Sequence, residues 1–133
     1  MTLHDDIIEQ FGRSIGMQGL RLRQDGALRL NMQQIGSLAF ELVGPYHEEV
    51  AVSLTRHVET TDDNAAERIL ELCHYRAPAP FPAHAGLTRA GHLIFAVRME
   101  TSEFTLPGLH QALDLLTSLH DHSSSFVRPA RLS

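Results

Sequence analysis

The sequence predicts an α+β fold, in which an antiparallel, twisted sheet of about five strands and three helices follow the order α-β-β-β-α-β-β-α. Two observations predict it. Apolar and polar residues alternate between Leu20 and Arg56, which is typical of strands that bury one face. Before and after this block, apolar residues recur every three or four positions, as in amphipathic helices. Because a sheet with one apolar face needs a cover, we expect the helices to pack on it.

Length and composition fit one ordinary globular domain. The chain has 133 residues, of which 43% are hydrophobic and 20% charged, and no apolar window reaches the roughly 18 residues of a membrane span. The formal charge of −5 disfavours nucleic acid and anionic membranes as partners. Acidic residues near the start, where a signal peptide needs basic ones, predict a cytoplasmic protein. We expect a single domain over residues 1–133 with a mobile tail at 123–133.

A first amphipathic helix is predicted near the amino terminus. Thr2 and Asp5 have the spacing of a capping box, and Gly16 offers a left-handed stop. The apolar residues in between repeat at three and four positions: Leu3, Ile7, Ile8, Phe11 and Ile15. Since one sheet face takes one stripe of such residues, we expect some of them to stay open to a partner.

The following segment predicts a β-hairpin. A three-residue loop over residues 24–26, with Gly26 in the left-handed conformation, would pair Leu22 with Leu28 and Leu20 with Leu30 on one face. A two-residue Asp-Gly loop would mix the apolar and polar faces, so we predict the longer loop. Two more antiparallel strands, around residues 38–42 and 50–54, then complete a meander.

A middle helix is predicted after Asn64, and its apolar residues spread over more than one stripe. A second surface must cover part of it, and we expect a partner subunit there. The residues expected at this dimer interface are Ala66, Ile69, Leu70 and Cys73. Cys73 is the single cysteine, so it forms no disulfide within the chain, and we interpret it as a buried structural thiol.

The last third of the chain predicts a connector, two strands and a helix. Three prolines at residues 78–82 exclude helix and central strand. Strands are predicted at residues 84–88 and 92–99, and a helix opens at Thr105-Leu106-Pro107 and continues to about Leu119.

No motif in the sequence predicts a catalytic, metal or cofactor site. The chain contains no HExxH, no cysteine pair, no GxSxG, no GxGxxG and no lysine for a phosphate-binding loop. We therefore expect no catalytic residues, no metal and no cofactor, although nine histidines are present. Apolar residues in excess of one domain's evident need indicate binding of another polypeptide.

Four motifs carry a resemblance to a known family: Ile8-x-x-Phe11-Gly12-x-x-Ile15-Gly16, Leu20-x-Leu22-x-x-Asp25-Gly26, Ile69-Leu70-Glu71-Leu72 and Gly91-His92-Leu93-Ile94-Phe95. Their order and spacing, from Asp5 to His122, resemble the type III secretion chaperones of the Tir chaperone family, of the effector-binding class I. The chain departs from the family where Cys73-His74-Tyr75 stands in place of a frequent Ala-Asn pair.

The resemblance implies a bacterial, non-enzymatic α+β homodimer that takes part in virulence by binding a secreted effector. Such a chaperone keeps the amino-terminal segment of the effector extended, soluble and competent for secretion, without ATP or metal. An extended peptide can add to a sheet edge while its apolar side chains fill shallow pockets. The residues we expect to bind the effector are Ile7, Phe11, Leu20, Leu22, Leu28 and Leu30. The alternative for these side chains is plain core under the first helix.

Two other functions stay open. The same fold could serve as a regulatory binding module that sequesters an activator or another chaperone. A small enzyme that uses histidine as acid and base is the third hypothesis, with His84 and His92 as candidates because both border the second hairpin.

Overall fold

The computed structural model describes residues 3–32, 35–60, 63–75 and 81–129. It confirms the predicted α+β fold, and a short sixth strand is added to the predicted five. The elements in chain order are α1 (Leu3–Ser14), β1 (Ala27–Met32), β2 (Gly36–Val43), β3 (Glu49–Thr60), α2 (Ala65–Tyr75), β4 (Ala83–Leu87), β5 (His92–Glu100), α3 (Leu106–His122) and β6 (Val127–Pro129), with single 3-10 turns at Thr101–Glu103 and Ser123–Ser125. The expected cap at Thr2 and residues 77–80 of the connector lie outside the described residues.

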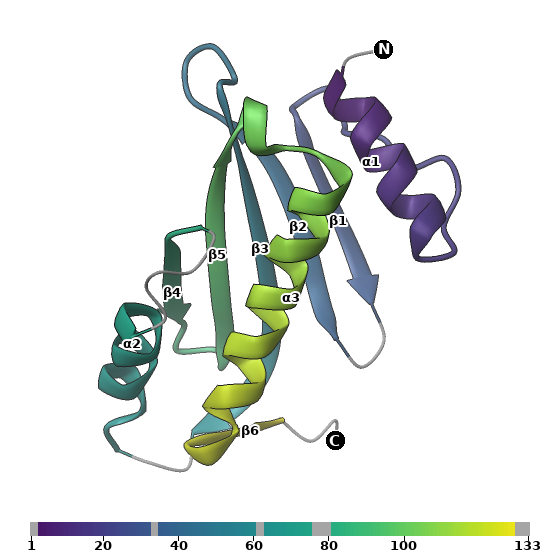
Figure 1. Ribbon diagram of the computed structural model, residues 1–133. Helices are drawn as coiled ribbons and strands as arrows, with labels where there is room; N and C mark the ends of the chain where they lie inside the picture. The colour runs from purple at the N-terminus through teal and green to yellow at the C-terminus, as the bar shows by residue number, and fades with distance from the viewer. Residues whose placement is uncertain (1–2, 33–34, 61–62, 76–80, 130–133) are drawn as a thin grey trace.

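The sheet is antiparallel at every described pairing, in the order β1-β2-β3-β5-β4, and β6 pairs with the far end of β3. β1 and β4 are therefore the two edge strands. In Figure 1 the helix α3 runs across the middle strands, α2 lies beside β4 and α1 lies at the β1 side. The helices thus stand over one face of the sheet, and α3 contacts both β3 and β5.

The two faces of the sheet differ in burial because side chains alternate along each strand. The face under the helices holds the core of the chain. Its fully or almost fully buried strand residues are Leu30, Leu38, Phe40, Val50, Val52, Leu54, Leu93, Phe95, Val97 and Met99. On the opposite face the central positions are small or polar and half-buried, as in the row Ala39, Ser53 and Ala96. The predicted alternation at residues 38–42, 50–54 and 92–99 is confirmed.

The end of α1 follows from Gly16, as predicted. Gly16 has φ +83, a conformation that glycine adopts without steric cost. Its N–H donates to the Arg13 carbonyl (3.2 Å) and the Met17 N–H donates to the Gly12 carbonyl (2.7 Å), which is the hydrogen-bond pattern of a Schellman cap. The chain therefore turns sharply out of the helix before Leu20.

The predicted hairpin between residues 20 and 30 is only partly correct. The loop is confirmed: Gly26 has φ +80, and the Arg23 N–H donates to the Ala27 carbonyl (2.8 Å) across it. Residues 20–23, however, belong to no strand, so Leu20 does not pair with Leu30 in a ladder. Leu20 packs instead against α1, where a Cβ on Gly12 would lie 2.7 Å from its Cδ1. Because Leu20 packs on α1, the segment before the loop does not extend the ladder with β1.

The first half of the segment expected to be a mobile tail, residues 123–133, is ordered in the fold. Residues 123–125 form a helical turn, and β6 pairs with β3 at Val58, Glu59 and Thr60. Phe126 and Val127 are buried, with 5% and 4% exposure. These two apolar side chains, which follow a run of serines, supply the burial that holds the segment. Residues 130–133 lie outside the described part of the chain.

Phe11 joins three elements of the fold: α1, the sheet and α3. Its side chain is fully buried, and its ring lies 5.9 Å from the Phe40 ring in a T-shaped arrangement and 5.4 Å from the His110 ring. Ser14, one turn later, lies 3.2 Å from the same imidazole, measured from Oγ to Nε2. Phe11 is thus the contact of α1 with both the sheet and α3, and the expectation that it lines an open groove is not supported.

His120 holds the other end of α3 against the sheet. It is 3% exposed, and its Nε2 lies 2.7 Å from the Leu54 carbonyl oxygen, so this nitrogen carries the proton and donates. The ring packs edge-on against Phe95 at 4.8 Å. Burial lowers the pKa of His120 to about 4, and the Arg56 charge acts in the same direction, against the opposing hydrogen bond and Asp121. The imidazole is therefore neutral in the folded protein at physiological pH.

We predict that Phe11→Ala lowers the free energy of unfolding by about 3–5 kcal/mol, because it removes a fully buried ring and leaves a cavity between three elements. The measurement is urea unfolding followed by circular dichroism. Met17→Ala, at a side chain that is 36% exposed, is the control and should cost less than about 1 kcal/mol. Equal effects of both changes would contradict the assignment of Phe11 to the core.

We also predict an acid-dependent loss of stability caused by His120. Its pKa is lower in the folded chain, about 4 against 6.5, so its stabilising effect is complete above about pH 6.5 and is lost as the pH falls towards 4. The loss attributable to this group approaches about 3 kcal/mol over that range. Unfolding free energies at several pH values measure it.

The matched comparison for this prediction uses glutamine, which can donate to the Leu54 carbonyl but does not titrate. His120→Gln should lose less stability than the wild type between pH 6.5 and 4, whereas His84→Gln, at an exposed position, should follow the wild-type curve. An identical pH dependence in the wild type and in His120→Gln would contradict the role of His120.

Candidate partner-binding site

The outer edge of β1 presents backbone groups that the sheet does not use. The Leu42 N–H donates to the Gly26 carbonyl (2.9 Å), and the register continues with Leu28 opposite Phe40. In an antiparallel ladder every second residue bonds to the same neighbour, so the even-numbered residues of β1 bond to β2. Arg29 and Asn31 therefore direct their N–H and C=O groups away from the sheet.

The turn before β1 closes only the first position of this edge. The Ala27 carbonyl accepts from Arg23, and the Ala27 N–H donates to Oδ1 of Asp25 (3.1 Å). Within the described residues, β1 has no strand neighbour other than β2. The edge thus remains open at Arg29 and Asn31, which is the arrangement that accepts an added strand.

Burial separates the six apolar residues predicted to bind a partner into two groups. Phe11 and Leu30 are buried, at 0% and 6% exposure, and serve the core of the chain itself. The other four are partly buried and pack against that core: Ile7, Leu20, Leu22 and Leu28. These four, which we call the apolar rim, still have surface that a partner can cover.

Sequence reasoning missed Arg29 and Asn31 as site residues. Both are polar, and the pattern of the sequence only places them on the face opposite Leu28 and Leu30. Their importance depends on β1 being an edge strand, which the order of strands decides and alternation does not reveal. The one available signal was the absence of any large apolar residue on that face of β1, since edge strands tolerate a polar exposed face.

The four residues predicted at a dimer interface also divide. Ile69 is 2% exposed and faces the core of its own chain, together with Ala65. Leu70 is 61% exposed and Ala66 is exposed too, four positions away on the same ridge of α2. Cys73 is half-buried, and burial raises the pKa of its thiol, which fits a structural rather than a nucleophilic cysteine.

The histidines proposed for catalysis do not come together. His84 on β4 lies opposite Ala96, whereas His92 lies opposite His57 on the neighbouring strand. Ala96 and His92 are four residues apart on β5, a separation of about 13 Å along the strand. His92 instead stacks on the His57 ring at 5.0 Å. Among the described residues no three His, Cys, Asp or Glu side chains are grouped to hold a metal ion.

A hollow of about 730 Å³ lies beside β3, near the point where its pairing with β2 ends and its pairing with β6 begins. Its apolar walls include Met32, Ile35, Val58 and Val127. Arg56 in its wall lies 3.3 Å from Asp121, and Arg128 lies 3.0 Å from Glu59. Since these two cations are already paired within the chain, the walls favour apolar side chains over a charged ligand.

No helix in the described part of the chain has the length and apolar character to cross a membrane.

Solved structures share this fold over almost the whole chain. A chain of the ExsC–ExsE complex superposes with a TM-score of 0.72 at 16% identity, covering 94% of this chain and 93% of that one. The HopA1–SchA chaperone–effector complex gives 0.66 at 15% identity, covering 91% and 90%. The ExoU–SpcU complex of the Pseudomonas aeruginosa type III secretion system gives 0.64 at 16% identity, covering 92% and 99%. At these identities the likeness establishes the fold.

The sequence itself matches one protein family. A comparison with curated proteins gives no significant match. The family described as type III secretory system chaperone SycN, however, matches residues 4–124, which include every helix and strand from α1 to α3 almost completely. This match confirms the resemblance to secretion chaperones seen in the four motifs. The chain therefore belongs to the type III secretory system chaperone SycN family.

Proposed function

We propose that this secretion chaperone binds the amino-terminal segment of a secreted effector as an extended strand along the outer edge of β1. The observation that carries the proposal is the open edge itself. Arg29 and Asn31 each offer an outward N–H and C=O, and Leu28 of the apolar rim lies on the same strand. Backbone hydrogen bonds hold an extended segment of almost any sequence, while the rim selects for apolar side chains.

In this mode of binding the chaperone would hold its effector without ATP. A segment held as an added strand cannot fold back on its own chain, and its apolar side chains are removed from water at roughly 25 cal/mol for each square ångström buried. The fold occurs elsewhere in complexes of this kind, since the HopA1–SchA structure is a chaperone–effector complex. We extend that role to the present chain on the strength of its family and of its open edge.

We further propose that the chain forms a homodimer through the outer ridge of α2. Leu70 is the large apolar side chain on this ridge, and it is 61% exposed although the opposite face of the helix packs on β4 and α3. Ala66 beside it is small enough for a second helix to approach closely. A paired α2 would cover Leu70 without disturbing Ile69 beneath it.

We infer that the protein acts by binding and not by catalysis. The two histidines suggested for acid–base chemistry stand about 13 Å apart along the sheet. The single cysteine has a raised pKa and is partly buried, which disfavours a thiolate nucleophile. A regulatory module that sequesters another protein would use the same edge, and identifying the bound partner by mass spectrometry distinguishes it from effector delivery.

The edge is tested by Asn31→Pro, which removes one outward N–H without removing a bond to β2. Proline is tolerated on an edge strand, so the fold should persist. We expect effector binding to weaken about ten-fold, because the added strand loses a hydrogen bond and keeps an unpaired acceptor. The measurement is retention, by each tagged variant, of the amino-terminal region of the effector that copurifies with the wild-type chaperone.

The matched control is Asn31→Ala, which changes the same side chain and keeps the N–H. It should retain the effector as the wild type does. Full retention by a correctly folded Asn31→Pro variant would show that the effector binds elsewhere.

The homodimer is tested by Leu70→Asp, which places a charge at the centre of the proposed contact. A buried unpaired carboxylate costs several kcal/mol, so sedimentation at micromolar concentration should show a shift from dimer to monomer. The monomeric variant should still unfold in a cooperative thermal transition, because the substitution lies outside the core of the subunit. Ser102→Asp is the control, because Ser102 is exposed on a turn outside α2, and this variant should sediment as the wild type does. A monomeric wild type, or a dimeric Leu70→Asp variant, would rule out this interface.

A further inference from the structure

Arginine gathers at the β1 edge although the whole chain is acidic. The formal net charge is −5, yet Arg21, Arg23 and Arg29 lie within nine residues and all are exposed. Arg23 is 3.6 Å from Asp25, measured from Nη2 to Oδ2. No ion pair within the described residues involves Arg29. Arg29 is therefore the cation at the middle of the open edge that remains available to a partner.

The register of β1 decides which face of an added strand meets this cation. Leu28 and Leu30 point to the face under the helices, and Arg29 between them points to the uncovered face. The residues of a strand paired with β1 alternate in the same way. The residue opposite Arg29 must therefore lie between two residues that stand beside the leucines.

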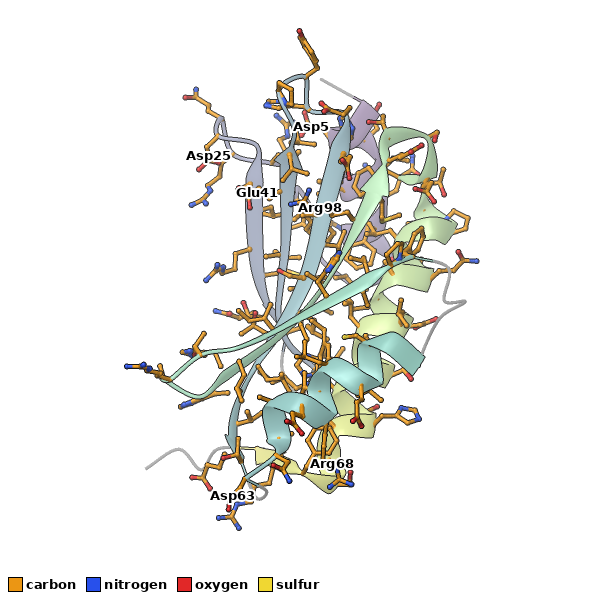
Figure 2. The ribbon with its side chains drawn as sticks, turned by 90° about the vertical axis from the view of Figure 1, so that its left-hand side faces the viewer. Asp5, Asp25, Glu41, Asp63, Arg68 and Arg98 are labelled. Carbon is orange, nitrogen blue, oxygen red and sulfur yellow. The ribbon has the colours of Figure 1, made fainter. Side chains whose placement is uncertain are left out.

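A small hollow marks where that side chain would go. It has a volume of about 140 Å³ and opens on the uncovered face between Arg23 and Arg29, over the small side chains of Ala27, Ala39 and Ser53. Its inner wall holds one carboxylate, Glu41 on β2, which projects on the same side of the sheet as Arg98 (Figure 2). The inner side of Arg29 thus already has an acidic neighbour, and the outer side, where a partner strand would lie, has none in the described chain.

We propose that the effector segment held at β1 carries an acidic residue opposite Arg29, flanked on both sides by apolar residues opposite Leu28 and Leu30. The inference rests on the proposed function and names the chemistry of its partner. The apolar pair continues the covered face of the sheet, and the carboxylate pairs with the guanidinium at the rim of the small hollow. Opposite charges directly across a strand pair attract, and like charges repel, so the same position also rejects lysine and arginine.

The test uses three capped nine-residue peptides of alternating valine and threonine, which differ only in carrying Glu, Gln or Lys at the central polar position. Each is titrated into ¹⁵N-labelled chaperone, and the shifts of the Arg29 and Asn31 amides report both the site and the affinity. We expect affinity in the order Glu, Gln, Lys, with about a three- to ten-fold span from first to last. The order should reverse in Arg29→Glu.

Arg98→Glu is the matched control, because Arg98 is exposed on the same uncovered face but three strands away on β5 (Figure 2). It should keep the wild-type order of the three peptides. An acidic preference in the wild type and in Arg98→Glu, together with its reversal in Arg29→Glu, would support the inference.

Two other results would overturn it, and they differ in what they leave standing. If all three peptides shift the Arg29 and Asn31 amides with equal affinity, the acidic preference is wrong and the edge remains the binding site. If no peptide shifts these amides while the natural effector segment still binds the chaperone, the inference falls together with the proposed use of the edge.

Discussion

The sheet buries only one of its faces, and this constraint determines where every helix must lie. The covered face carries the large side chains, among them Leu54, Phe95 and Val97, which α3 seals by crossing β3 and β5. The other face has small and polar residues at its centre, so it gains little from a cover. With α3 over the middle, α1 and α2 close the two sides of the same face, as Figure 1 shows.

Histidine explains much of how α3 is held. Three histidines make packing contacts in or beside this helix: the His4 ring lies 5.6 Å from the ring of Phe104, just before α3, in a tilted arrangement, His110 meets Phe11 of α1, and His120 donates to the Leu54 carbonyl. An imidazole combines an apolar ring face with a polar edge, which suits a buried site that also needs one hydrogen bond. These three histidines therefore serve the packing of the helices.

The two edges of the sheet are treated differently, and the difference has functional consequences. β4 at one edge is backed by α2, whose buried face packs on it. In the described part of the chain, β1 at the other edge is bounded only by the turn at residues 23–27, because Leu20 packs on Gly12 of α1 instead of continuing along the strand. An unpaired edge invites association, so proteins normally block it. In a chaperone that must hold an extended chain, the same feature serves recognition.

The sequence by itself determined the class of fold, the type of almost every element and the family. Alternation and helical spacing are local properties of the chain, so they predicted strands at residues 38–42, 50–54 and 92–99 and helices at both ends. Turn chemistry was equally local, as Gly16 and Gly26 show. Tertiary structure alone decided which apolar residues are core. Phe11, Leu30 and Ile69 belong to periodic patterns just as Ile7, Leu28 and Leu70 do. The first three side chains are buried and the other three are partly or largely accessible, and the packing of the elements alone makes this difference. It also decided that Phe126 and Val127 find a place beside β3, and that β1 stands at an edge, because strand order depends on contacts between residues far apart in the chain.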